Sequence, residues 1–89
     1  MDNRTTHYYK DIKQSVAFGL PCEGLGDTIC ATPTIRKVSE AYDNKIVVYS
    51  KHPKVFKNLS YVESSLHYND IHENQELKDS YDYYYQTEI

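Results

Sequence analysis

The stretch SVAFGLPCEGLGDTICATPTIRKVSEAYDNKIVVYS, residues 15–50, decides the fold of this chain. It opens with a compact apolar run at residues 15–20, and such a run followed by turn-forming residues is typical of a strand buried on both faces. A second run, at residues 45–50, is rich in β-branched and aromatic side chains and indicates another strand. The amphipathic segment between the runs predicts a helix, so the whole stretch predicts a strand–helix–strand unit of a parallel sheet.

Four apolar residues of the connecting segment, spaced four, three and four apart, share one helical face: Ala31, Ile35, Val38 and Tyr42. Pro33 allows two starting points for this helix. Either Thr32 is the N-cap and Pro33 the first helical residue, or a short turn from Asp27 runs into a longer helix. We favour the second arrangement, with a helix that begins near Asp27, adjusts at Pro33 and ends at residues 43–44.

The rest of the chain predicts shorter elements: a helix over residues 53–58, a third strand within residues 62–68, a loop or surface helix in residues 69–80, and a fourth strand over residues 81–87. We therefore expect an α/β fold, a Rossmann-like parallel sheet of about four strands with flanking helices over residues 15–89, after a polar lead-in at residues 1–14. Because a helix normally covers each parallel strand, we expect the domain to be partial.

Composition excludes several classes of function. The net charge is -3 and no basic cluster stands out, which argues against nucleic-acid binding. Cys22 and Cys30 have a spacing unlike common zinc or redox motifs, and the four histidines are scattered, so we expect reduced thiols and no metal or cofactor. No apolar run approaches the roughly 20 residues of a transmembrane helix, and no signal peptide is visible, so we expect a cytoplasmic location.

The loop Gly24-Leu25-Gly26-Asp27 follows the first strand and is the candidate functional site. Ligands of open α/β sheets bind beyond the carboxyl ends of the strands, and glycines let the backbone approach a ligand. Asp27 is our candidate catalytic residue, and its structural alternative is a helix N-cap. The structural alternative for the glycines is a tight turn that needs positive φ. Neither G-x-G-x-x-G nor G-x-x-x-x-G-K-[ST] is present, which disfavours a nucleotide at this loop.

Other residues at the same expected edge of the sheet are weaker candidates. Lys51 and His52 follow the second strand and are placed to touch an acceptor, with a solvated loop as the alternative. The tyrosines within residues 81–85 form either a sugar-stacking surface or an uncovered strand edge. The candidate substrate-binding residues are Gly24, Leu25, Gly26, Thr28 and Lys51.

The segment GLGDTICATPTIRKVSEAY, residues 24–42, followed by KIVVYS, resembles the opening of glycosyltransferase family nine, the heptosyltransferase-like enzymes. Their N-terminus typically has an apolar strand, a G-[LM]-G-D motif, a few small or apolar residues, T-P and an amphipathic helix. Residues 56–62 and Tyr81-Asp82 also fit the family. The resemblance covers residues 15–89, and its specific element is the combination of Gly-Leu-Gly-Asp with Thr32-Pro33.

The resemblance implies a GT-B architecture, of which this chain is the N-terminal, acceptor-side half without the second domain. It implies metal-independent, inverting transfer from a nucleotide-sugar to a glycan or lipid-linked acceptor in surface polysaccharide or lipopolysaccharide synthesis. Asp27 then corresponds to the family's proposed general base, and peripheral membrane association of the full-length enzyme is an option. We expect no turnover by this chain alone. The alternatives are a free-standing flavodoxin-like ligand-binding or interaction module, and a non-catalytic remnant that pairs with another chain.

Overall fold

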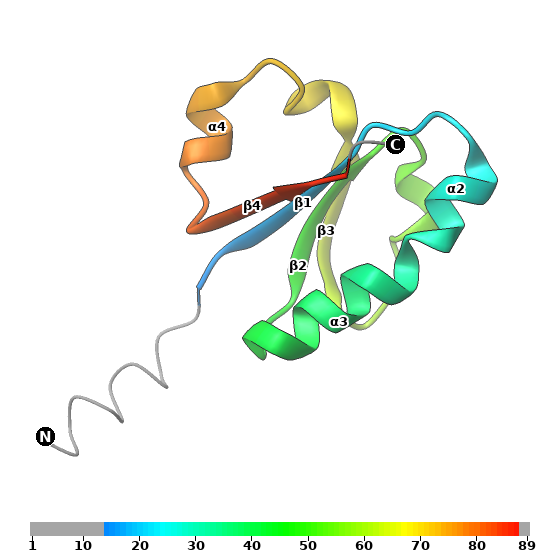
Figure 1. The fold of residues 1–89 in the computed structure, drawn as a ribbon, viewed down its shortest axis with the longest axis horizontal. Coiled ribbons are helices and arrows are strands. Elements are labelled where there is room, and N and C mark those ends of the chain that lie inside the picture. The colour runs from blue at the N-terminus through cyan, green and yellow to red at the C-terminus, as the bar shows by residue number, and fades with distance from the viewer. Residues whose placement is uncertain (1–13, 88–89) are drawn as a thin grey trace, which may run out of the picture.

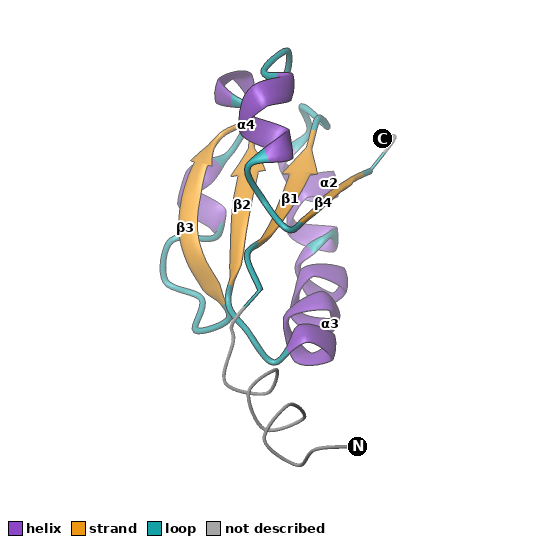
Figure 2. Cartoon of the chain, turned by 90° about the vertical axis from the view of Figure 1, so that its left-hand side faces the viewer, coloured by secondary structure: helices purple, strands orange, loops and turns teal. Residues whose placement is uncertain are grey.

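The structure is a computed structural model that describes residues 14–87, so the expected lead-in at residues 1–14 lies, apart from Gln14, outside the described residues. Figures 1 and 2 show a single twisted sheet with helices on both of its faces. All strand pairs are parallel, in the order β3-β2-β1-β4. The strands are β1 (Val16–Leu20), β2 (Ile46–Ser50), β3 (Val62–His67) and β4 (Tyr83–Gln86). The expected α/β fold with a four-stranded parallel sheet is confirmed.

The helical elements are α2 (Leu25–Cys30), α3 (Thr32–Tyr42), α4 (Gln75–Asp79) and the 3-10 turns η1 (Pro53–Val55) and η2 (Tyr68–Asp70). For residues 69–80 we expected either a loop or a surface helix, and α4 shows that the helix is correct. The Asn74 side chain caps α4 by accepting a hydrogen bond from the Leu77 N–H at 3.0 Å. The helix expected over residues 53–58 is shorter than predicted, because only one 3-10 turn forms there.

The crossover from β1 to β2 contains two helices where we expected one adjusted helix. The first begins at Leu25, ahead of the expected start near Asp27, and the break falls at Ala31. Pro33 has no N–H to donate to the Ile29 carbonyl, so the helical ladder cannot continue through it. The Thr32 hydroxyl donates to that carbonyl instead, at 2.9 Å. At the other end α3 stops as expected, with Asp43 in the left-handed conformation at φ 50°.

One face of the sheet packs against α2, α3 and η1. Alternate residues of β1 and β2 point to this side, and they meet side chains from the helical elements. The buried residues of this cluster are Val16, Phe18, Leu20, Cys22, Ile35, Ile46, Val48, Phe56 and Val62. The predicted apolar face of α3 is thus confirmed: Ile35 is fully buried, and its three partners pack against the cluster.

The opposite face packs against η2 and α4, and its core is smaller and more aromatic. Ala17, Tyr49, Tyr68 and Ile71 are buried there. The hydroxyls of Tyr49 and Tyr81 lie 2.5 Å apart. β1 is therefore covered on both sides, which explains why its sequence is a continuous apolar run rather than an alternating one.

The two crossovers next to β1 lie on opposite faces of the sheet. The chain leaves β1 through α2 and α3 on one face, and it enters β4 from α4 on the other face (Figure 2). The direction of the strand order therefore reverses between β1 and β4. In open α/β sheets a reversal of this kind opens a crevice at the carboxyl ends of the two strands, and ligands bind there.

Candidate functional site

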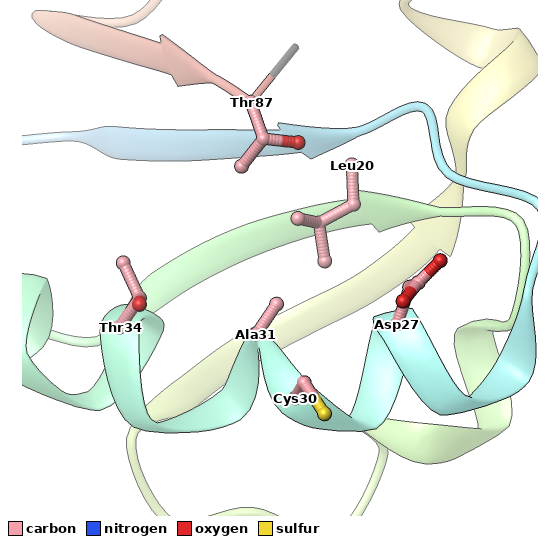
Figure 3. A pocket seen from close by; sticks show the side chains of 6 residues that line it. All are labelled: Leu20, Asp27, Cys30, Ala31, Thr34 and Thr87. Atoms are coloured by element: carbon pink, nitrogen blue, oxygen red, sulfur yellow. The ribbon is translucent and has the colours of Figure 1, made fainter. Parts of the chain in front are cut away.

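A hollow of about 210 Å³ opens at this reversal point, between the carboxyl ends of β1 and β4 and the α2–α3 crossover (Figure 3). Figure 3 shows Leu20 of β1 pointing toward the helices, with Thr87 on the β4 side of the hollow. The lining residues are Leu20, Asp27, Cys30, Ala31, Thr34 and Thr87. The hollow thus includes Asp27, the residue that the sequence singles out for chemistry.

Asp27 lies in the first turn of α2, and its carboxylate is free. The N-cap of α2 is Gly24, in an extended conformation, and no side chain caps this end. The alternative interpretation, in which Asp27 is only the N-cap of the helix, is therefore wrong, because the helix begins two residues before Asp27. The Asp27 side chain is exposed and makes no hydrogen bond or ion pair with any residue from 14 to 87. Its two oxygens are available to accept hydrogen bonds from a ligand.

The glycines of the loop act by their size and not by a special backbone conformation. No glycine in residues 14–87 has a positive φ, so the tight-turn interpretation is wrong. A Cβ at Gly24 would lie 3.4 Å from a carboxylate oxygen of Asp27, which is an ordinary contact distance, so glycine leaves this side of the carboxylate uncovered. A Cβ at Gly26 would meet nothing within 4 Å, which leaves an open approach to the backbone of the first turn.

Thr28 and Leu25 differ sharply in their exposure. Thr28 is fully buried, and its hydroxyl donates to the Gly24 carbonyl at 2.9 Å and lies 3.6 Å from the Cys22 sulfur. Its backbone N–H donates to the same carbonyl at 3.1 Å. Thr28 therefore fastens the loop to the helix, with no group turned toward the hollow. Leu25 is 52% exposed and is accessible on the outside of α2.

Lys51 lies apart from the hollow. Residues alternate between the faces of β2, and Lys51 continues the row of Tyr49, on the face opposite α2. Its ammonium group donates to Asn69 at 3.0 Å and lies 5.6 Å from the centre of the Tyr68 ring. His52 does reach the loop, because its Nε2–H donates to the Glu23 carbonyl at 2.7 Å. His52 therefore supports the loop from β2, and Lys51 is not assembled with Asp27.

The tyrosines near β4 divide between the two faces of the sheet. Tyr83 and Tyr85 lie beside Tyr42 of α3, with ring centres 5.0 and 6.2 Å from it, and both are partly exposed. Tyr84 points to the other face, where its hydroxyl donates to Gln86 at 2.9 Å. None of these tyrosines lines the hollow.

Sequence reasoning missed Thr87, Thr34 and Cys30 as lining residues. The Thr87 hydroxyl is buried and has no hydrogen-bond partner within residues 14–87. Thr87 reaches the hollow because β4 pairs with β1, and its N–H donates to the Gly19 carbonyl at 3.2 Å. Thr34 lies in the T-P-T segment that opens α3, so a signal for it was present in the sequence. Nothing in the local sequence marks Thr87.

The described residues contain no group of three His, Cys, Asp or Glu side chains that would hold a metal ion. Cys22 and Cys30 are free thiols, the first buried and the second exposed. Across residues 14–87, every helix is too short or too polar to cross a membrane.

No protein-family model, curated protein or solved structure matches the chain. The resemblance to glycosyltransferase family nine therefore stays a prediction. The geometry by itself offers one free carboxylate, two threonine hydroxyls and an apolar floor at a crevice where α/β proteins bind ligands. This arrangement can hold an uncharged polar group and can accept a proton from it.

Proposed function

We propose that this chain binds the acceptor in a glycosyl-transfer reaction and that Asp27 is the general base. The observation that carries the proposal is the free carboxylate of Asp27 in the hollow between the ends of β1 and β4. The hollow is smaller than the roughly 300–1,000 Å³ pockets that enclose drug-sized ligands, and it suits one sugar ring or less. The sequence resemblance supplies the reaction class, heptosyltransferase-like transfer from a nucleotide-sugar.

The proposed chemistry requires that the acceptor hydroxyl lies between the Asp27 carboxylate and the donor sugar. An acceptor hydroxyl donates a hydrogen bond to Asp27, and its oxygen attacks the anomeric carbon of the donor sugar. The hydroxyl proton passes to the carboxylate as the new glycosidic bond forms, and the nucleotide leaves with the bonding electron pair of the old bond. We assign the nucleotide-sugar to a separate α/β domain, as the resemblance implies, because the β1–α2 loop lacks both nucleotide-binding fingerprints.

A ligand-binding module without catalysis is the second candidate. One observation favours it, namely that the hollow joins the free Asp27 carboxylate with a Thr87 hydroxyl that has no partner within residues 14–87, so two groups for holding a polar ligand are already present. Binding of a small polar ligand then needs no second domain, whereas transfer does. The two candidates share the same site and differ in whether a sugar donor is used.

Binding of a methyl glycoside, measured by saturation-transfer NMR, tests the site. Asp27→Ala removes the carboxylate and should weaken binding about tenfold or more, because hydrogen bonds to charged groups contribute roughly 1.5–3 kcal/mol. Asp79→Ala is the matched control, since Asp79 is an exposed carboxylate on α4, on the opposite face of the sheet. Equal binding by wild type and Asp27→Ala would contradict the proposal.

A turnover assay tests where the donor site lies. The purified chain should show no transfer from nucleotide-sugar donors to the methyl glycoside. Transfer by the chain alone would contradict the assignment of the donor site to another domain. Binding of the glycoside without any effect of Asp27→Ala would place the ligand outside the hollow and would contradict both candidates.

A further inference from the structure

The hollow has an apolar floor and a polar rim. Leu20 and Ala31 supply aliphatic surface, and Asp27, Thr34 and Thr87 supply oxygen atoms around it (Figure 3). A sugar ring has the matching character, because its C–H groups pack on aliphatic side chains while its hydroxyls form directed hydrogen bonds. The helices and β4 contribute the polar residues from opposite sides, so a ring between them is held at more than one point.

Thr87 provides the second polar contact. Its hydroxyl is buried without a partner in residues 14–87, although its backbone is fixed by the hydrogen bond from its N–H to Gly19. A buried hydroxyl without a partner is costly. A rotation of the Thr87 side chain about χ1 that turns the hydroxyl into the hollow lets a ligand hydroxyl complete its hydrogen bond and removes that cost. Because β4 pairs with β1, the backbone position of Thr87 is set by the sheet, and only one side-chain torsion has to change.

The charge of the lining determines which sugars fit. Asp27 is the one charged residue among the six, and none of them is basic. Lys51 directly follows β2 and is the first basic residue at this edge of the sheet. Its ammonium group bonds to Asn69 on the other face of the sheet, away from the hollow. A phosphate or carboxylate in the hollow would therefore face the Asp27 carboxylate without a compensating cation.

We infer that the hollow binds an uncharged sugar ring through two of its hydroxyls, one donating to Asp27 and one bonded to Thr87. This inference rests on the proposed function for the role of the site, and it adds the substrate class and a specificity-determining residue. Sugars that carry a phosphate or a carboxylate on the ring portion that enters the hollow are excluded by the same geometry.

Alkylation of Cys30 by iodoacetamide provides a direct readout of occupancy. Cys30 lines the hollow and is exposed, whereas Cys22 is buried, so the reaction reports on this site. Methyl glucoside should protect Cys30, while glucose 6-phosphate and glucuronate should protect it less at equal concentration. In Thr87→Val the protecting concentration should rise about three- to tenfold, and in Thr87→Ser it should stay near the wild-type value.

The outcomes separate this inference from the proposed function. Protection that is lost in Asp27→Ala but unchanged in Thr87→Val, or equal protection by charged and uncharged sugars, would overturn the inference alone. Absence of protection by every sugar would overturn both. The unfolding midpoint of Thr87→Val is measured alongside, and it should not fall, because the hydroxyl makes no hydrogen bond within residues 14–87 that the variant would lose.

Discussion

At the scale of single residues, two glycines have opposite surroundings. A Cβ at Gly19, in the middle of β1, would overlap the Tyr84 hydroxyl, whereas a Cβ at Gly26 would meet open space. Any larger residue at position 19 thus requires the Tyr84 side chain to shift. Glycine at position 26 is not required by packing, which makes it available for a ligand to approach.

We expect Gly19→Ala to destabilise the chain by about 1–2 kcal/mol, because Tyr84 must move to admit the methyl group. The double variant with Tyr84→Phe, which lacks the overlapping hydroxyl, should recover part of the loss. Urea unfolding measures both. A wild-type midpoint for Gly19→Ala would show that Tyr84 moves aside freely.

Gly26→Ala is the matched substitution with the opposite expectation. It should leave stability unchanged or raise it by about 0.5 kcal/mol, since alanine favours a helix over glycine. It should also weaken binding of a methyl glycoside, because the added methyl covers the open approach to α2. Unchanged binding would show that the ligand does not contact this turn.

At the scale of elements, α2 depends on Thr28 for its connection to β1. Thr28→Val keeps the volume and removes the hydroxyl that donates to the Gly24 carbonyl, in a fully buried position. We expect a loss of about 1–2 kcal/mol in the free energy of unfolding. Thr28→Ser keeps the hydrogen bond and should lose less. If the valine variant were the more stable of the two, the hydroxyl would not be what fastens the loop.

The elements themselves were largely predictable from local patterns. A buried apolar run gave β1, a helical period gave the buried face of α3, and a β-branched run gave β2. The start of the helix at Leu25 and the break at Ala31 were not predicted correctly, because Gly24 in an extended conformation serves as N-cap and Thr32 satisfies the Ile29 carbonyl. The candidate Asp27 was found from its loop, whereas Thr87 depends on which strand β4 pairs with, and no local pattern encodes that.

At the scale of the whole molecule, buried tyrosines couple stability to pH. Burial raises the pKa of Tyr49 well above its usual value, and burial also raises the pKa of Tyr84 to about 12. These hydroxyls stay protonated in the folded chain at pH values where they ionise in the unfolded chain, above about pH 10. Their contribution to stability is therefore complete below about pH 10 and is lost as the pH rises from there.

Urea unfolding at a series of alkaline pH values measures this effect. The free energy of unfolding of the wild type should fall between about pH 10 and 12, and Tyr49→Phe should show a shallower fall. Identical slopes for the two proteins would show that Tyr49 does not contribute to the pH dependence.

The topology of the sheet also predicts where a ligand binds. The crossovers change faces between β1 and β4, and the hollow lies at the carboxyl ends of these two strands. The most direct measurement is amide chemical-shift mapping of the ¹⁵N-labelled chain during titration with methyl glucoside. We expect the largest shifts at Leu20, Asp27, Thr34 and Thr87, around the hollow. Shifts confined to Lys51 and Asn69 on the other face, or to the tyrosines beside Tyr42, would contradict this site.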